Sequence, residues 1–184
     1  MIRPFHKQAK DGPFEYCAVL LDLQDWELGP IIADFIDPKD LTSDPGIETD
    51  THITVIYGLT ENDPEAVRKC LDFLPGAVIF SVGVTTIFQE DDYDVVVLEV
   101  DSPELEELHQ AIMEAVPNEQ TFDTYVPHIT LAYVKRGAGM KYAGEPILPG
   151  QISGEVFARD AVMFSDFDGG MTAVPFPEGV TGAG

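Results

Sequence analysis

The sequence predicts a single α+β domain built from two similar halves. The first observation is a repeated strand, because "HITVIYGL" begins at His52 and "HITLAYVK" begins at His128, 76 positions later. The second is that "AVLLDLQDWEL" (18–28) aligns with "VVVLEVDSPEL" (95–105), so that Asp22 meets Glu99. Each copy runs strand, helix, loop, His-Ile-Thr strand. Two long copies are too few for a solenoid and favour two lobes related by a pseudo-twofold axis.

In the first half, residues 14–23 are rich in apolar and β-forming side chains and predict a strand. Residues 25–36 have a weaker helical pattern, interrupted by Gly29-Pro30, and the turn-rich residues 37–50 predict a loop. The first His-Ile-Thr strand follows at 52–58.

Between the halves, residues 62–76 predict a helix that Asp63 caps, with Pro64 in its first position. Further strands are expected at 77–88 and 93–100, separated by an acidic turn. Ser102 then begins a helix whose apolar face consists of Leu105, Leu108, Ile112 and Val116.

The second His-Ile-Thr strand leads into a loop at 136–151, and 153–167 predicts one or two last strands. We therefore expect an N-terminal arm (1–13), one bilobal domain (14–167) and an extended or disordered tail (168–184). Within the domain, the two repeats span about residues 16–58 and 93–134.

Composition limits the classes of function. The formal net charge is −23, which disfavours binding to long DNA or RNA but not to a small phosphorylated ligand. Halophilic adaptation would give the same composition and stays open. Neither a signal peptide nor a membrane span is apparent, and Cys17 and Cys70 form neither a disulfide framework nor a zinc set. We expect a cytoplasmic protein with no obligate protein partner.

The repeated motif places polar side chains on one face. Side chains alternate along a strand, so His52 and Thr54 share a face opposite Ile53, and His128 and Thr130 do likewise in the second copy. The same alternation predicts Tyr57 and Tyr133 on the core face, as packing residues. A pseudo-twofold axis would bring the two imidazoles and the two hydroxyls into one cleft.

Two histidines and two threonines fit phosphodiester cleavage. One histidine can activate the attacking oxygen as a base while the other protonates the leaving oxygen as an acid. The threonine hydroxyls can donate to the non-bridging oxygens, where charge is concentrated. No metal-ligand spacing is evident and no cofactor is expected. The sequence does not assign the acid and the base.

The two H-x-T motifs, within matched halves, resemble the signatures of the two-histidine (2H) phosphoesterase superfamily, the LigT-like proteins. The resemblance covers about residues 14–165 and is strongest in "YVPHITLA". It implies a bilobal LigT-like fold with two antiparallel sheets, flanking helices and a central cleft. It also implies metal-independent phosphodiesterase activity, with His52, Thr54, His128 and Thr130 as the catalytic residues.

The substrate class stays less defined. "DPGIETDTHITVIYGL" resembles phage-encoded 2H enzymes, which implies cleavage of 3′–5′ bonds in cyclic oligonucleotides, the messengers of bacterial CBASS defence. On that expectation the chain would act in the host cytoplasm. The alternatives are a 2′,3′-cyclic phosphodiesterase that processes RNA ends and a non-catalytic nucleotide sponge. Intact motifs argue against the sponge.

Further candidates for substrate binding lie around the motifs. Each also has an ordinary structural interpretation, as a packing tyrosine, a solvated loop cation or a surface carboxylate. They are Tyr16, Tyr125, Lys135, Arg136 and Glu155, with Lys141 as a third basic residue after the second motif.

Overall fold

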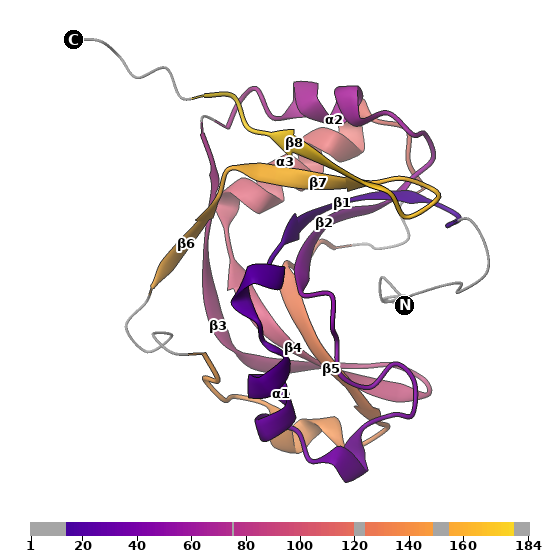
Figure 1. Cartoon of the computed structure of the whole chain (residues 1–184), viewed down its shortest axis with the longest axis vertical. Coiled ribbons are helices and arrows are strands. Elements are labelled where there is room, and N and C mark those ends of the chain that lie inside the picture. The colour runs from indigo at the N-terminus through magenta and orange to yellow at the C-terminus, as the bar shows by residue number, and fades with distance from the viewer. Residues whose placement is uncertain (1–13, 75, 120–123, 149–154, 179–184) are drawn as a thin grey trace.

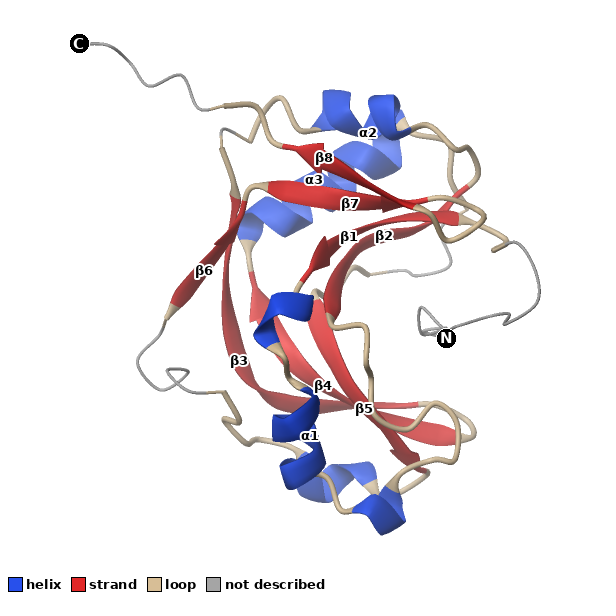
Figure 2. Ribbon diagram, viewed as in Figure 1, coloured by secondary structure: helices blue, strands red, loops and turns tan. Residues whose placement is uncertain are grey.

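The computed structural model describes residues 14–74, 76–119, 124–148 and 155–178, which form a curled antiparallel sheet with helices packed against it (Figures 1 and 2). The strands of the described residues are β1 (Cys17–Asp22), β2 (His52–Leu59), β3 (Val78–Gln89), β4 (Tyr93–Asp101), β5 (His128–Lys135), β6 (Val156–Arg159), β7 (Ala161–Ser165) and β8 (Met171–Pro175). The helices are α1 (Gly29–Phe35), α2 (Pro64–Cys70) and α3 (Pro103–Ala115), with short 3-10 helices at Gln24–Trp26, Pro38–Asp40 and Gly139–Tyr142.

The sheet consists of two four-stranded halves. Its order is β6-β3-β4-β5-β2-β1-β7-β8, so the two His-Ile-Thr strands, β5 and β2, are neighbours at the centre. They pair through one residue pair, Ile53 with Ile129. The expected bilobal α+β fold is confirmed, and its two sheets meet edge to edge in one continuous sheet.

The sequence repeat corresponds to a structural repeat in which the halves exchange their helices. β1, α1 and β2 match β4, α3 and β5 in order. Helix α3 follows β4, yet it packs against α2 and against β2 of the other half. Helix α1 follows β1, yet Phe35 at its end contacts Tyr142, in the 3-10 helix that packs on β3 and β4. Figure 1 shows α1 at one end of the molecule and α2 and α3 at the other.

The loops after these helices are exchanged too. The loop after α1 runs beside β5, where the Glu48 amide donates to the carbonyl of Leu131 at 2.8 Å. The loop after α3 runs beside β2, where the Glu119 amide donates to the carbonyl of Gly58 at 2.9 Å. Each His-Ile-Thr strand is therefore paired with backbone that the other half supplies.

Helix starts agree with the sequence better than helix ends do. The Asp63 side chain accepts from the amide of Ala66, and Ser102 accepts from Leu105, as capping residues. The predicted helix at 62–76 ends at Cys70 and continues only as turns. Gly29-Pro30 does not interrupt a helix but begins α1, because proline suits the first helical turn. The predicted apolar face of α3 is buried, with Leu105, Leu108 and Ile112 fully inaccessible.

The C-terminal segment differs from the expected tail. Residues 171–175 form β8, which pairs with β7, and Val174 and Phe176 are buried. The sheet therefore continues past residue 167, because Val174 and Phe176 bury their side chains and hold this edge strand against the core. Residues 1–13 and 179–184, the expected arm and the end of the tail, lie outside the described residues.

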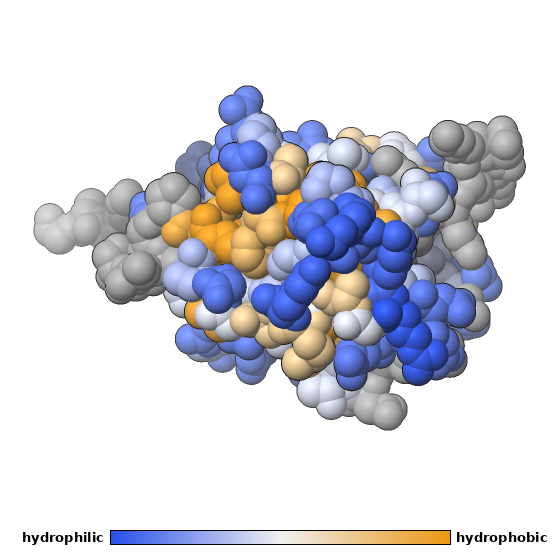
Figure 3. Space-filling view, turned by 90° about the horizontal axis from the view of Figure 1, so that it is seen from below, coloured by the Kyte–Doolittle hydropathy of each residue, from blue (hydrophilic) through white to orange (hydrophobic). Residues whose placement is uncertain are grey.

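The surface at the α1 end of the molecule has a hydrophobic patch that is bordered by hydrophilic residues (Figure 3). Within the described ranges, every helix is too short or too polar to traverse a lipid bilayer.

Gly58 provides a test of the exchanged pairing. Its φ is +106°, and a Cβ there would lie 2.7 Å from the carbonyl oxygen of Glu119. We expect Gly58→Ala to lower the free energy of unfolding by about 2 kcal/mol or more, from backbone strain and the clash. Gly29→Ala is the control, since no atom lies within 4 Å of its added methyl group. Urea unfolding measures both variants, and equal stability of the two would contradict the pairing of this loop with β2.

Candidate active site

The two motif strands bring four polar side chains to one face at the centre of the sheet. Because antiparallel pairing joins Ile53 to Ile129, the register sets Thr54 beside His128 and His52 beside Thr130. Both isoleucines are fully buried, whereas the two histidines and two threonines are partly exposed. Each histidine thus lies next to the threonine of the other motif.

The two imidazoles have the same backbone partner. Nδ1 of His52 lies 2.5 Å from the carbonyl oxygen of Asp50, and Nδ1 of His128 lies 2.7 Å from that of Val126. A carbonyl only accepts, so Nδ1 carries the proton and donates, which we infer from the hydrogen bond. In the neutral ring, Nε2 then holds the lone pair and can take up a proton from a reacting group.

The environment of His128 disfavours its charged form. The Phe88 ring meets the His128 ring edge-on, with centroids 4.9 Å apart. Desolvation by burial lowers the pKa of His128; the bond to the Val126 carbonyl partly opposes this effect, and the neighbouring His52 adds a smaller lowering. On the Ile53–Ile129 register the two imidazoles are diagonal neighbours on one face of the sheet. His128 is therefore held neutral to lower pH than an ordinary histidine.

A carboxylate lies opposite each histidine on the adjacent strand. Asp22 of β1 pairs with His52, and Glu99 of β4 pairs with His128. Directly paired residues of an antiparallel sheet point to the same face, so both carboxylates border the cleft, and both are exposed. We did not predict them as site residues, although the sequence repeat aligns Asp22 with Glu99 and could have identified them.

The tyrosines of the motif strands lie on the cleft face, and the expectation that they face the core was wrong. Tyr133 pairs with Val95, and Thr130 with Val97, with a register shift between the two pairs. A comparable shift lies in β1 and β2, where Tyr57 pairs with Ala18. Such a bulge inserts one residue, which moves the following side chains to the opposite face.

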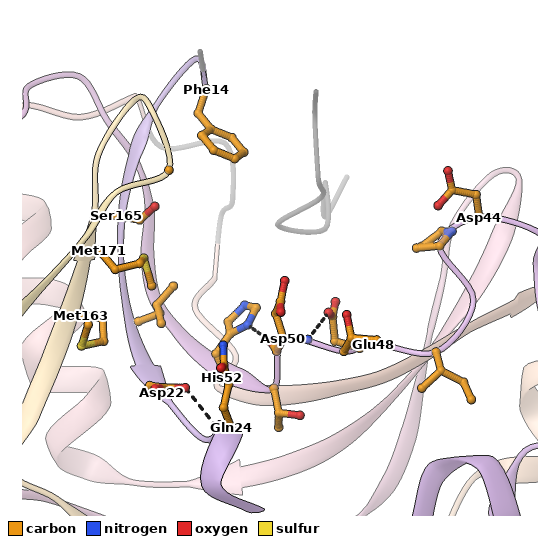
Figure 4. Close-up of a pocket in the computed structure, with 16 residues that line it drawn as sticks. Phe14, Asp22, Gln24, Asp44, Glu48, Asp50, His52, Met163, Ser165 and Met171 are labelled. Carbon is orange, nitrogen blue, oxygen red and sulfur yellow. Dashed lines mark hydrogen bonds between the residues drawn. The ribbon is translucent and has the colours of Figure 1, made fainter. Parts of the chain in front are cut away.

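A pocket of about 490 Å³ opens beside His52 (Figure 4). Its lining combines apolar side chains, among them Leu20 and Met163, with the carboxylates of Asp22, Asp44, Glu48 and Asp50. His128 is not part of this lining. Carboxylates accept hydrogen bonds from amino and hydroxyl groups, so the pocket suits a ligand with donors and an apolar body more than one with further phosphates.

Tyr125 is placed differently from the expected cleft rim. It packs against the main core, where its ring stacks on His109 of α3 with centroids 4.2 Å apart. Its hydroxyl donates to the carbonyl of Thr54 at 2.9 Å, and His109 bonds the carbonyl of Val55. Tyr125, which precedes His128 in the chain, therefore fastens the second motif to the first from the core side.

Tyr16 and Glu155 lie away from the motif histidines. Tyr16 precedes β1 at the end opposite Asp22, and its hydroxyl donates to Glu119 at 2.5 Å. This bond raises the pKa of Tyr16 to about 12. Glu155 is exposed just before β6, which is separated from β5 by β3 and β4. Substrate contact by either residue stays a prediction.

The basic residues after the second motif make contacts in loops. Lys135, at the end of β5, donates to the carbonyl of Lys39, and Arg136 donates to that of Asp91, each at 2.6 Å. Lys141 forms an ion pair with the buried carboxylate of Asp40, in the loop after α1. A strand rises about 3.3 Å per residue, so Lys135 lies about 20 Å along β5 from His128. Lys135 and the following Arg136 therefore lie too far along the strand direction to stand beside His128 and Thr130.

In the described part of the chain, no group of three or more histidine, cysteine, aspartate or glutamate side chains is arranged to hold a metal ion. The arrangement that the site does provide is a pair of imidazoles with two hydroxyl donors. It can move a proton at each of two positions on either side of a bound group.

Solved structures share the fold at low sequence identity. Usb1 from Kluyveromyces marxianus superposes with a TM-score of 0.58 at 7% identity, over 88% of this chain and 98% of that chain. LigT from E. coli, complexed with NADP+, gives 0.57 at 13% identity, over 88% and 94%. The same protein complexed with 3′-AMP gives 0.55 at 16% identity, over 89% and 95%.

No curated protein sequence matches the chain. A family model does match, and its match extends over residues 39–153, which include both His-Ile-Thr strands. The model describes the 2′-5′ RNA ligase superfamily. The two halves are duplicated, the motif strands are paired, and the family model matches more than half of the sequence. The chain therefore belongs to the 2′-5′ RNA ligase superfamily of 2H phosphoesterases.

Proposed function

We propose that the chain is a metal-independent phosphodiesterase that cleaves 3′–5′ bonds of small oligonucleotides, including cyclic ones, with His52 and His128 as its acid and base. The observation that carries the proposal is the arrangement of both histidines and both threonines on one face, across the Ile53–Ile129 pair. General acid–base catalysis requires groups at both the attacking and the leaving oxygen, and the two lobes supply one each.

His128 is the better candidate for the base. A base must be neutral before the reaction, and burial favours the neutral form of His128. Its Nε2 would accept the proton of a ribose 2′-hydroxyl or of water as that oxygen attacks phosphorus. His52, protonated at Nε2, would give a proton to the departing oxygen. Attack by the 2′-hydroxyl yields a 2′,3′-cyclic phosphate and a 5′-hydroxyl, whereas attack by water yields a phosphomonoester.

The charge distribution supports a short ligand. The net charge of −23 opposes a long polyanion. The pocket beside His52 is within the size range of small-molecule sites, and its carboxylates can accept from ribose hydroxyls or base amino groups. Degradation of cyclic nucleotide messengers of CBASS defence by a phage enzyme, in the cytoplasm of the host, is the biological role that we propose for this activity.

A substrate panel in excess EDTA tests the function. We expect cleavage of at least one cyclic dinucleotide or trinucleotide, unchanged by the chelator, because the imidazoles and hydroxyls supply the chemistry. Chromatography of the products, with 2′,3′-cyclic mononucleotides in the same panel, measures it. Activity that is lost in EDTA and restored by zinc or manganese would show that the histidines are ligands. Turnover of the mononucleotides alone would favour the RNA-end enzyme, and binding without turnover would favour the sponge.

Substitutions in the motifs should separate the roles. We expect His52→Ala or His128→Ala to lower kcat by about 10²–10⁴-fold, and the second change to cost less than the first, because the pair acts as a unit. Thr54→Ala or Thr130→Ala should cost about 10–10²-fold, as the loss of one neutral donor. Lys69→Ala, at an exposed position of α2, is the control and should keep the parental rate within about twofold. Near-parental cleavage by the double histidine variant would place catalysis elsewhere.

The pH profile tests the assignment of the base. Neutral His128 is present above its pKa, so kcat/KM should fall as pH drops through that pKa, and the lowered pKa puts this fall below about 6.5. Phe88→Ala should admit water and move the acidic limb to higher pH. Phe73→Ala is the control, since Phe73 is 44% exposed after α2. A limb that Phe88→Ala leaves in place would contradict His128 as the base.

A further inference from the structure

Each motif strand has a bulge directly after its threonine. β1 pairs with the residues on either side of Val55 but not with Val55 itself. β4 likewise passes over Leu131 in β5. A bulge leaves its extra residue out of the ladder and changes the direction of the side chains around it. The direction of the Thr54 and Thr130 hydroxyls therefore depends on how each bulge is held.

The two bulges are held by donors of different kinds. The carbonyl of Leu131 accepts from the backbone amide of Glu48 at 2.8 Å. The carbonyl oxygen of Val55 lies 2.7 Å from Nδ1 of His109, a side chain of α3. A carbonyl only accepts, so Nδ1 of His109 carries a proton and donates it. A side chain thus holds the bulge of the first motif, where the second motif uses the main chain.

Tyr125 holds the neighbouring carbonyl and also leads into the second motif. Its hydroxyl donates to the carbonyl of Thr54 at 2.9 Å. Its ring stacks on His109, with centroids 4.2 Å apart and planes 3° from parallel. The next residue, Val126, provides the carbonyl that accepts from Nδ1 of His128 at 2.7 Å. A movement of Tyr125 would therefore move both the first motif and the group that orients His128.

The stacked pair, His109 and Tyr125, lies on the core side of the motif strands. Tyr125 packs against the main core. Desolvation by burial lowers the pKa of His109, which the bond to Val55 partly opposes. Both hydrogen bonds end on main-chain carbonyls of β2, so the pair acts on a substrate only through the motif residues. Removal of His109 would leave the carbonyl of the fully buried Val55 without this donor.

We propose that His109 and Tyr125 are positioning residues, which hold the bulge of β2 and so fix the Thr54 hydroxyl and the His128 imidazole relative to one another. This inference rests on the proposed function, because it takes both groups to act on one phosphate. A misplacement of about 1 Å in a reacting group can cost about 10²-fold in rate. The stacked pair provides this placement at the seam, where β2 and β5 pair through one residue pair.

Tyr125→Phe tests the hydroxyl while the ring is kept. We expect kcat to fall about tenfold and KM to stay within about twofold, because groups that act in the transition state lose their placement. Tyr142→Phe is the control for the loss of a buried tyrosine hydroxyl, since Tyr142 donates to Asp40 in the loop after α1. This control should keep its kcat. A parental kcat in Tyr125→Phe would overturn the proposal.

A matched pair of substitutions tests His109. Asparagine and leucine have the same branched shape, but only asparagine places an N–H where histidine has Nδ1. We expect His109→Asn to keep kcat within about threefold and His109→Leu to lose about tenfold. Melting temperatures are measured for both variants and for Tyr125→Phe. If kcat follows the melting temperature across the three, as it would for merely structural residues, the positioning role is wrong.

The tautomer of His128 provides a readout that needs no turnover. Long-range ¹H–¹⁵N NMR spectra of the neutral ring should show the Nδ1–H tautomer in the parental chain. Tyr125→Phe should admit the Nε2–H tautomer, because the Val126 carbonyl is displaced. If this change occurs in a chain that cleaves no substrate of the panel, the proposed function is wrong and the placement of His128 by Tyr125 stands. An unchanged tautomer in Tyr125→Phe would overturn the inference, whether or not the chain is active.

Discussion

The pair Ile53–Ile129 is the contact on which the site depends. It is the one residue pair by which β2 and β5 join, and both side chains are fully buried. Because the strands run antiparallel, this single register sets each motif histidine beside the other motif's threonine. A slip by one residue would turn one His-Thr pair into the core, where three polar side-chain atoms would be costly to bury, so the register is strongly determined.

One residue pair is too little to hold two lobes, and the exchanged segments supply the rest. The loop after α1 bonds to β5, the loop after α3 bonds to β2, and Tyr125 ties the strand before His128 to the carbonyl of Thr54. The motif strand of each half therefore forms backbone hydrogen bonds with a loop of the other half. This interlocking explains how a weak seam at the centre of the sheet can carry a site that needs atoms from both sides at fixed positions.

The two halves repeat a plan but give their histidines different surroundings. His128 is desolvated and contacts Phe88, which favours its neutral form. His52 borders an open pocket with carboxylates. In the proposed mechanism an acid and a base made from the same residue type need different environments, and the desolvation of His128 beside Phe88 provides such a difference. The carboxylates of this pocket offer hydrogen-bond acceptors to a ligand and disfavour further negative charge in it.

The sequence by itself determined the duplicated order of elements, the two motif strands and the four residues that share a face, because these depend on local periodicity and on the repeat. The caps at Asp63 and Ser102 were equally local. Tertiary structure decided which face of the sheet the side chains after a bulge occupy. The alternation rule fails at Tyr133 because β5 absorbs an extra residue only when it pairs with the neighbouring strand β4. It also decided that β8 joins the sheet and that the lobes exchange their helices. Those outcomes depend on which surfaces meet, and no stretch of sequence contains that information alone.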